Sequence, residues 1–141
     1  MIRIAIQKSG RLHEESVRLL RDAGIAFSNG QGRLRTEATN FPLEIFFLRD
    51  DDIPEYVADG VADAGIVGRN IVLETQKNVR EMLPLGFGQC RLSIAIPKNQ
   101  TFNSPADLEG CSIATTYPRI LADYLAKNNV NATIHEISGA V

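Results

Sequence analysis

Positively charged side chains follow the ends of several short apolar segments in the sequence. Lys8 and Arg11 come just after the first such segment, Arg49 follows a later one, and Arg119 comes soon after a third. If these segments are parallel strands, their carboxyl ends meet at one edge of a sheet, where ligands bind in proteins of this class. Arginine offers phosphate oxygens a planar fork, and lysine offers a mobile point charge. We therefore expect a site for phosphate or pyrophosphate at this edge.

Glycines accompany these charges. Gly10 lies between the two cations of the first cluster, and Gly68 closes a glycine-flanked segment that begins at Asp63. Glycine lets the backbone approach a ligand closely, and the helix starts predicted after Gly10 and Thr116 would add amide donors for an anion. The residues alone leave plainer interpretations open, namely a surface turn around Gly10 and simple strand punctuation at 63–68. The GxxxxGK pattern of a Walker loop is absent from the sequence.

Other polar residues favour structural roles. Three consecutive carboxylates at 50–52 cannot all face one metal ion, so helix capping and solvated charge are favoured over a metal site. Cys90 has no histidine or asparagine positioned to activate it and is interpreted as a structural thiol, reduced like Cys111. The two histidines are isolated and are interpreted as surface or packing residues.

Apolar periodicity and turn residues divide the chain into alternating strands and helices. Strands are expected at 2–6, 43–48, 63–68, 81–87, 91–97, 112–115 and 132–137, with a weak one at 34–38. Helices are expected at 12–24, 53–60, 69–75 and 104–110, with another opening at 116–118. This alternation predicts an α/β fold with a mostly parallel sheet.

Two of these helices have an apolar face that predicts which of their residues are buried. The first helix is expected to bury Leu12, Leu19, Leu20 and Ala23. The last helix is expected to bury Tyr117, Ile120, Leu121, Tyr124 and Leu125. Core packing therefore competes with ligand binding as the role of Tyr117. The glycine-flanked segment 63–68 is expected to be a short buried strand.

The composition excludes several classes of protein. The 141 residues are 44% hydrophobic and 23% charged, which argues against disorder. No apolar run is long enough to span a membrane, and the amino terminus lacks the layout of a secretory signal, so we expect a cytoplasmic protein. The formal charge of −2 gives no global attraction for nucleic acid or an anionic membrane, and neither is expected as a partner.

Several segments, taken in order, resemble those of one enzyme family. They are Gln-Lys-Ser-Gly-Arg-Leu at 7–12, Arg-Asp-Asp-Asp-Ile-Pro at 49–54, and the segments 59–68, 88–95 and 113–118. Together they closely resemble the amino-terminal catalytic part of the ATP phosphoribosyltransferases, the enzymes of the first step of histidine biosynthesis. The resemblance covers essentially the whole chain, and the segment 49–54 is similar to that of the long form of the family.

The resemblance implies an α/β, two-lobed fold of the type II periplasmic-binding-protein kind. The first catalytic lobe would span 1–88, and 89–141 would begin the second lobe. That second lobe would be incomplete, because family members continue into a phosphate-binding loop that this chain does not reach.

The resemblance also implies a glycosyltransferase reaction. Such an enzyme transfers the 5-phosphoribosyl group from 5-phosphoribosyl 1-diphosphate to N1 of ATP and releases pyrophosphate. Mg²⁺ would accompany the substrates, and neither a covalent nucleophile nor a metal-binding residue of the chain is implied. Histidine would act as feedback inhibitor of the full-length enzyme, which would be a homo-oligomer. We expect the chain by itself to be inactive.

The resemblance implies substrate binding by Lys8, Gly10, Arg11, Arg49, Asp63, Gly68, Cys90 and Tyr117. Lys8 and Arg11, helped by Gly10, would hold phosphates of ATP or of the product. Arg49 and Asp63 would line the cleft near the nucleotide. Tyr117 would pack on adenine or orient the ribose.

Two other outcomes are set against the enzyme. A cytosolic module that binds small anions or amino acids would share the fold without catalysis, and pyrophosphate release separates the two functions. A chain with an incomplete second lobe would expose a sheet edge and apolar surface, which predicts self-association.

Overall fold

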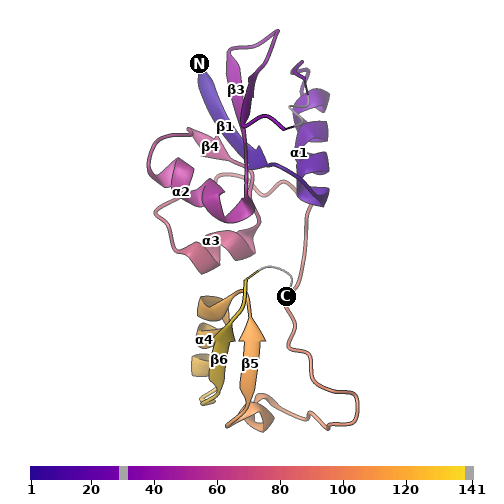
Figure 1. Cartoon of the computed structure of the whole chain (residues 1–141), viewed down its shortest axis with the longest axis vertical. Coiled ribbons are helices and arrows are strands. Elements are labelled where there is room, and N and C mark those ends of the chain that lie inside the picture. The colour runs from indigo at the N-terminus through magenta and orange to yellow at the C-terminus, as the bar shows by residue number, and fades with distance from the viewer. Residues whose placement is uncertain (29–31, 139–141) are drawn as a thin grey trace. The chain divides into compact units, whose positions relative to one another are not determined.

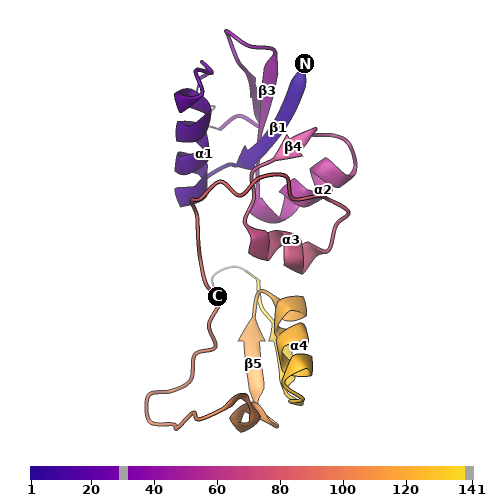
Figure 2. The same ribbon diagram turned by 180° about the vertical axis from the view of Figure 1, so that it is seen from behind.

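The computed structural model describes residues 1–28 and 32–138. They belong to two compact units, Met1–Cys90 and Arg91–Val141. Figure 1 shows the chain, and Figure 2 shows it from behind. Each unit has its own sheet and its own hydrophobic core.

The first unit contains a four-stranded sheet in the order β2-β3-β1-β4. β1 pairs in parallel with β3 and β4, and β2 pairs antiparallel with β3. The strands are β1 (Ile2–Gln7), β2 (Arg35–Glu37), β3 (Leu43–Leu48) and β4 (Ala64–Gly65). The helices are α1 (Arg11–Asp22), the 3-10 helix η1 (Asp50–Asp52), α2 (Ile53–Ala58) and α3 (Arg69–Thr75). The predicted alternation is confirmed here, and the range predicted for α3 matches.

The central strands are apolar on both faces because helices cover both. α1 lies over one face of the sheet and α2 over the other (Figures 1 and 2). On the α1 face, Ile45 of β3 belongs to one core cluster with Val17 and Leu20 of the helix. On the α2 face, the next residue, Phe46, clusters with Ile53. The uninterrupted apolar run of β3 is thus typical of a parallel strand that is buried on both sides.

The second unit contains a two-stranded parallel sheet. Its elements are the 3-10 helix η2 (Pro105–Leu108), β5 (Ser112–Thr115), α4 (Pro118–Lys127) and β6 (Thr133–Glu136). The core consists of Leu108, Leu121, Leu125 and Val130. The predicted burial of Tyr124 is wrong, because 39% of this residue is exposed and a sheet this small leaves the flank of α4 uncovered.

The strands predicted at 81–87 and 91–97 are wrong. Neither range contains a strand, and Met82, Leu83 and Leu92 are exposed. Alternating apolar residues form a strand only where a neighbouring strand offers partners for the backbone amides and carbonyls. Neither range pairs with another strand in the part of the chain that the structure describes.

The strand predicted at 63–68 is shorter and less buried than expected. β4 covers only Ala64–Gly65, and both residues are exposed because β4 is an edge strand of the sheet. The burial lies on its two sides, at Ala62 and Ile66.

The buried face of α1 also differs from its prediction. Ser16, Val17 and Leu20 are buried, whereas Leu19 and Ala23 are exposed. Residues spaced by three and four positions share a helix face, so the contact through Val17 and Leu20 turns Leu19 to its margin.

None of the described helices combines the length and apolarity that a membrane crossing requires.

Candidate functional site

The carboxyl ends of β1 and β3 place two cations side by side. In the parallel register Gln7 is opposite Leu48, and the Lys8 amide donates to the Leu48 carbonyl at 2.8 Å. Lys8 and Arg49 therefore leave the sheet from adjacent strands, and both are exposed. The structure brings together here two of the cationic positions that the sequence singled out, Lys8 and Arg49.

Gly10 sets the start of α1 next to these cations. Its φ of +87° lies in the left-handed region that favours glycine, and its carbonyl accepts a hydrogen bond from the Glu14 amide at 3.2 Å. The helix begins at Arg11, whose side chain is 89% exposed. Arg11 thus projects from the amino end of a twelve-residue helix, where free backbone amides favour an anion.

The three aspartates after Arg49 form a structure of their own. They make up η1, in which the Asp50 carboxylate accepts a hydrogen bond from the Asp51 amide at 2.8 Å. Asp52 precedes α2 but makes no side-chain capping bond, so the capping predicted for the start of α2 is wrong. The reason is that the chain already turns helically through η1 before α2 begins.

A hollow of about 300 Å³ opens at this edge of the first unit. Its lining comes from the end of β1, from the starts of η1, α1 and α3, and from the segment 88–90. The lining residues are Gln7, Arg11, Leu12, Asp50, Gly68, Asn70, Ile71, Gly88, Gln89 and Cys90. Arg11, Gly68 and Cys90 were predicted as binding residues. Lys8, Gly10 and Arg49 belong to the same edge without lining the hollow.

Asn70 is the lining residue that sequence reasoning missed most clearly. A Cβ built on Gly68 would lie 2.4 Å from the Asn70 Oδ1 atom, so the glycine leaves room for the amide to fold back over the turn. A polar side chain in the first turn of a helix that follows a sheet edge is the signal that would have found it.

Cys90 is exposed, and both Cys90 and Cys111 are free thiols.

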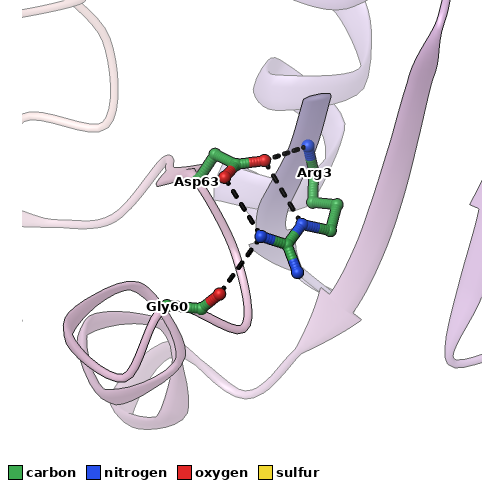
Figure 3. A network of polar contacts seen from close by, with 3 residues as sticks. All are labelled: Arg3, Gly60 and Asp63. Carbon is green, nitrogen blue, oxygen red and sulfur yellow. Dashed lines mark hydrogen bonds and ion pairs between the residues drawn. The ribbon is translucent and has the colours of Figure 1, made fainter. Parts of the chain in front are cut away.

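Asp63 lies at the other end of the sheet. Its carboxylate accepts hydrogen bonds from the Arg3 backbone amide at 2.8 Å and from the Arg3 guanidinium at 3.1 and 3.3 Å (Figure 3). The guanidinium also donates to the Gly60 carbonyl at 3.1 Å. Arg3 is at the amino end of β1, so the structure does not bring Asp63 to the edge that carries Lys8 and Arg49. Asp63 instead joins the loop before β4 to β1.

This ion pair makes the free energy of unfolding depend on pH. The hydrogen bonds from Arg3 hold the pKa of Asp63 below its ordinary value of 3.8. A carboxylate with a lowered pKa stabilises the folded state above its unfolded pKa, and that contribution disappears as the pH falls through the folded value. We expect Asp63→Asn to lower the free energy of unfolding near pH 7, and the difference from the unmodified chain to shrink below about pH 4.

Urea unfolding at neutral and acid pH measures this difference. Asp59→Asn, at the exposed end of the neighbouring helix, is the matched control and should show no such convergence. A deficit of Asp63→Asn that stays constant across the acid range would contradict the assignment.

Tyr117 and Arg119 belong to the second unit. Tyr117 is the half-buried residue that precedes α4, and its amide donates to the Thr115 Oγ1 atom at 2.9 Å. The predicted contact of Tyr117 with adenine or ribose stays a prediction.

Comparisons with known proteins agree with one another. The family model of ATP phosphoribosyltransferase matches residues 49–141. Relatives named ATP phosphoribosyltransferase are 59% identical in Cytophaga hutchinsonii and 49% identical in Parabacteroides distasonis, each over all of this chain. This chain covers 49% and 50% of them, respectively, so it spans about half the length of the curated relatives it matches.

A solved structure gives the same result for the fold. The HisG:HisZ ATP phosphoribosyl transferase complex from Thermotoga maritima contains a chain that is 27% identical to this one. The match covers all of this chain and 66% of that one, with a TM-score of 0.77. The predicted α/β class and its type II periplasmic-binding-protein kind are confirmed by this match.

Proposed function

This chain belongs to the ATP phosphoribosyltransferase family, and we propose that it supplies the nucleotide-binding edge of an enzyme that transfers 5-phosphoribosyl groups to ATP. The reaction joins the anomeric carbon of 5-phosphoribosyl 1-diphosphate to N1 of adenine. The bond from that carbon to pyrophosphate breaks, and the leaving oxygen takes the electron pair. The observation that carries the proposal is the cationic edge, where Lys8 and Arg49 leave adjacent strands beside the hollow that Arg11 lines.

The residues of this edge would bind and orient rather than react. Arg11 can bind two phosphate oxygens at once, Lys8 adds a point charge, and the amino end of α1 adds backbone donors. Gly68 and Cys90 shape the wall of the hollow. Transfer through a dissociating sugar cation needs correct placement and charge stabilisation, and it proceeds without a covalent intermediate on the protein.

Asp50 would meet a magnesium ion that enters with the substrates. It is the one carboxylate among the described residues that line the hollow. Magnesium in such sites is bound through one or two carboxylates together with substrate phosphates, so a single aspartate fits the donor set. When bound, Mg²⁺ supplies neutralisation of the charge on the leaving pyrophosphate.

The wider proposal concerns the whole enzyme. We propose that it works in the cytoplasm, in histidine biosynthesis, under feedback inhibition by histidine, and that it assembles as an oligomer. The Thermotoga maritima structure, which is a complex, supports assembly. We further propose that residues 1–88 are one catalytic lobe and that 89–141 begin the second.

Completing the chain tests the function. This chain is fused to the part of the Cytophaga hutchinsonii relative that lies beyond the matched half, and the chimera is mixed with ATP, 5-phosphoribosyl 1-diphosphate and Mg²⁺. We expect the chimera to release pyrophosphate. We expect the chain alone to bind ATP but to release no pyrophosphate. A silent chimera beside an active complete relative would contradict the proposal. Nucleotide binding by the chimera without release would support a binding module instead.

A further inference from the structure

Glu15 is an acidic residue placed next to the cationic hollow. It lies one helical turn after Arg11 in α1, and the Arg11 Nε atom is 3.8 Å from the Glu15 Oε1 atom. The Glu15 side chain is only 19% exposed, against 89% for Arg11. The Glu15 Oε2 atom is buried and has no hydrogen-bond partner in the described part of the chain. The fold therefore holds a carboxylate beside Arg11 and leaves half of it unsatisfied.

Gly88 lies beside this carboxylate. A Cβ built on Gly88 would lie 3.8 Å from the Glu15 Oε2 atom and 2.9 Å from the Leu12 Cδ1 atom. The Gly88 backbone therefore lies against the first turns of α1, and its φ of +64° adds to the requirement for glycine. Gly88 and Arg11 both line the hollow, so the Glu15 carboxylate lies just behind its wall.

An anion in the hollow competes with Glu15 for Arg11. The existing ion pair is long, and its arginine is almost fully exposed to water, so the pair is weak and can be exchanged for a better partner. A pyrophosphate group offers Arg11 two oxygens in a bidentate arrangement, which the single 3.8 Å approach of Glu15 does not. The carboxylate also stays close after the exchange, because its own side chain is packed under Gly88.

We propose that Glu15 is the counter-ion of Arg11 in the ligand-free protein, and that a phosphate-bearing ligand must displace it to bind. Glu15 is thus a positioning residue that acts through Arg11 and sets the affinity of the hollow for polyphosphate. The inference rests on the proposed function, because it takes the ligand of Arg11 to be the polyphosphate of a nucleotide.

The experiment compares Glu15→Gln with the unmodified chain, using inorganic pyrophosphate as the probe in calorimetric titrations at low salt. We expect Glu15→Gln to bind pyrophosphate about two- to fivefold more tightly, the size of effect expected for one partly exposed ion pair. The gain should shrink at high salt and should vanish in the Arg11→Ala background. Glu14→Gln, an exposed neighbour on the same helix, is the control and should bind like the unmodified chain.

A second readout observes the pair without any ligand. In nitrogen-15 spectra of the free chain, the Arg11 Nε–H resonance should change on Glu15→Gln and stay unchanged on Glu14→Gln. Unchanged or weaker pyrophosphate binding by a folded Glu15→Gln, or an unmoved Arg11 resonance, would overturn the inference. If the Arg11 resonance changes but no variant binds pyrophosphate, the ion pair is confirmed. The anion site and the displacement of Glu15 by a ligand are then both contradicted.

Discussion

Replacing Arg11 with alanine should weaken ATP binding more than tenfold in the completed chimera. The arginine lies at the amino end of α1 and lines the hollow, and its guanidinium can bind two phosphate oxygens. Its removal also leaves the Glu15 carboxylate without its counter-ion, and this adds repulsion to the lost hydrogen bonds. The measurement is the dissociation constant for ATP, together with kcat and KM from pyrophosphate release. Because the lost contact is to bound substrate, most of the effect should fall on KM for ATP.

The matched control is Arg18→Ala, a change of the same kind on an exposed arginine farther along α1. It removes the same charge from the same helix but from a residue that does not line the hollow. Arg18→Ala should change the dissociation constant for ATP by no more than about twofold, because a surface charge outside the site acts on the ligand only through a field that salt screens. If both variants bind ATP equally well, Arg11 does not belong to the nucleotide site.

The first seventy-five residues show what sequence periodicity can predict. A strand such as β3 is largely apolar because two helices cover it. Gly10, Pro54 and Gly68 lie at the starts of α1, α2 and α3, respectively. Once β1 and β3 are parallel, Lys8 and Arg49 must leave the sheet at the same edge. This part of the candidate site follows from strand direction alone.

Asp63 shows what strand direction indicates about a candidate binding residue. A residue that precedes a parallel strand lies at the amino end of the sheet, opposite to the residues that follow the neighbouring strands. Asp63 precedes β4 and meets Arg3 accordingly (Figure 3). Its inclusion among the binding residues came from the resemblance, and the placement of Asp63 relative to the strand argues for a structural role.

The segments 81–87 and 91–97 show a limit of another kind. The alternating pattern predicts that each segment can present one apolar face, but it does not predict which strand pairs with that segment. The identity of the partner is a long-range property, and no described strand pairs with either segment.

The sequence analysis missed Glu15 for a related reason. Its side chain lies close to Gly88, which is far away in the sequence and reaches α1 only through the fold.

Replacing Gly65 with alanine should lower the free energy of unfolding of the first unit by about 1–3 kcal/mol. A Cβ on Gly65 would lie 2.6 Å from the Ile53 Cγ2 atom and 3.3 Å from the Val57 Cγ2 atom of α2. Ile53 is fully buried, so it cannot move aside without disturbing the core on this face of the sheet. β4 pairs with β1 at Ala5, which prevents the strand from retreating. Urea unfolding measures the loss, and Ala64→Ser at the exposed neighbour should change stability by less than about 0.5 kcal/mol.

A double-mutant cycle identifies the contact that is responsible. Ile53→Ala removes the methyl group that the new Cβ would strike, at a cost of about 2–5 kcal/mol for the cavity it leaves. In that background the 2.6 Å contact with Ile53 is gone and the 3.3 Å approach to the Val57 Cγ2 atom remains, so Gly65→Ala should cost less than it does alone. The coupling between the two changes should therefore be favourable and of about 0.5–3 kcal/mol. Strict additivity would contradict the steric account, because it would mean that the cost arises in the backbone of β4 and not at its contact with α2.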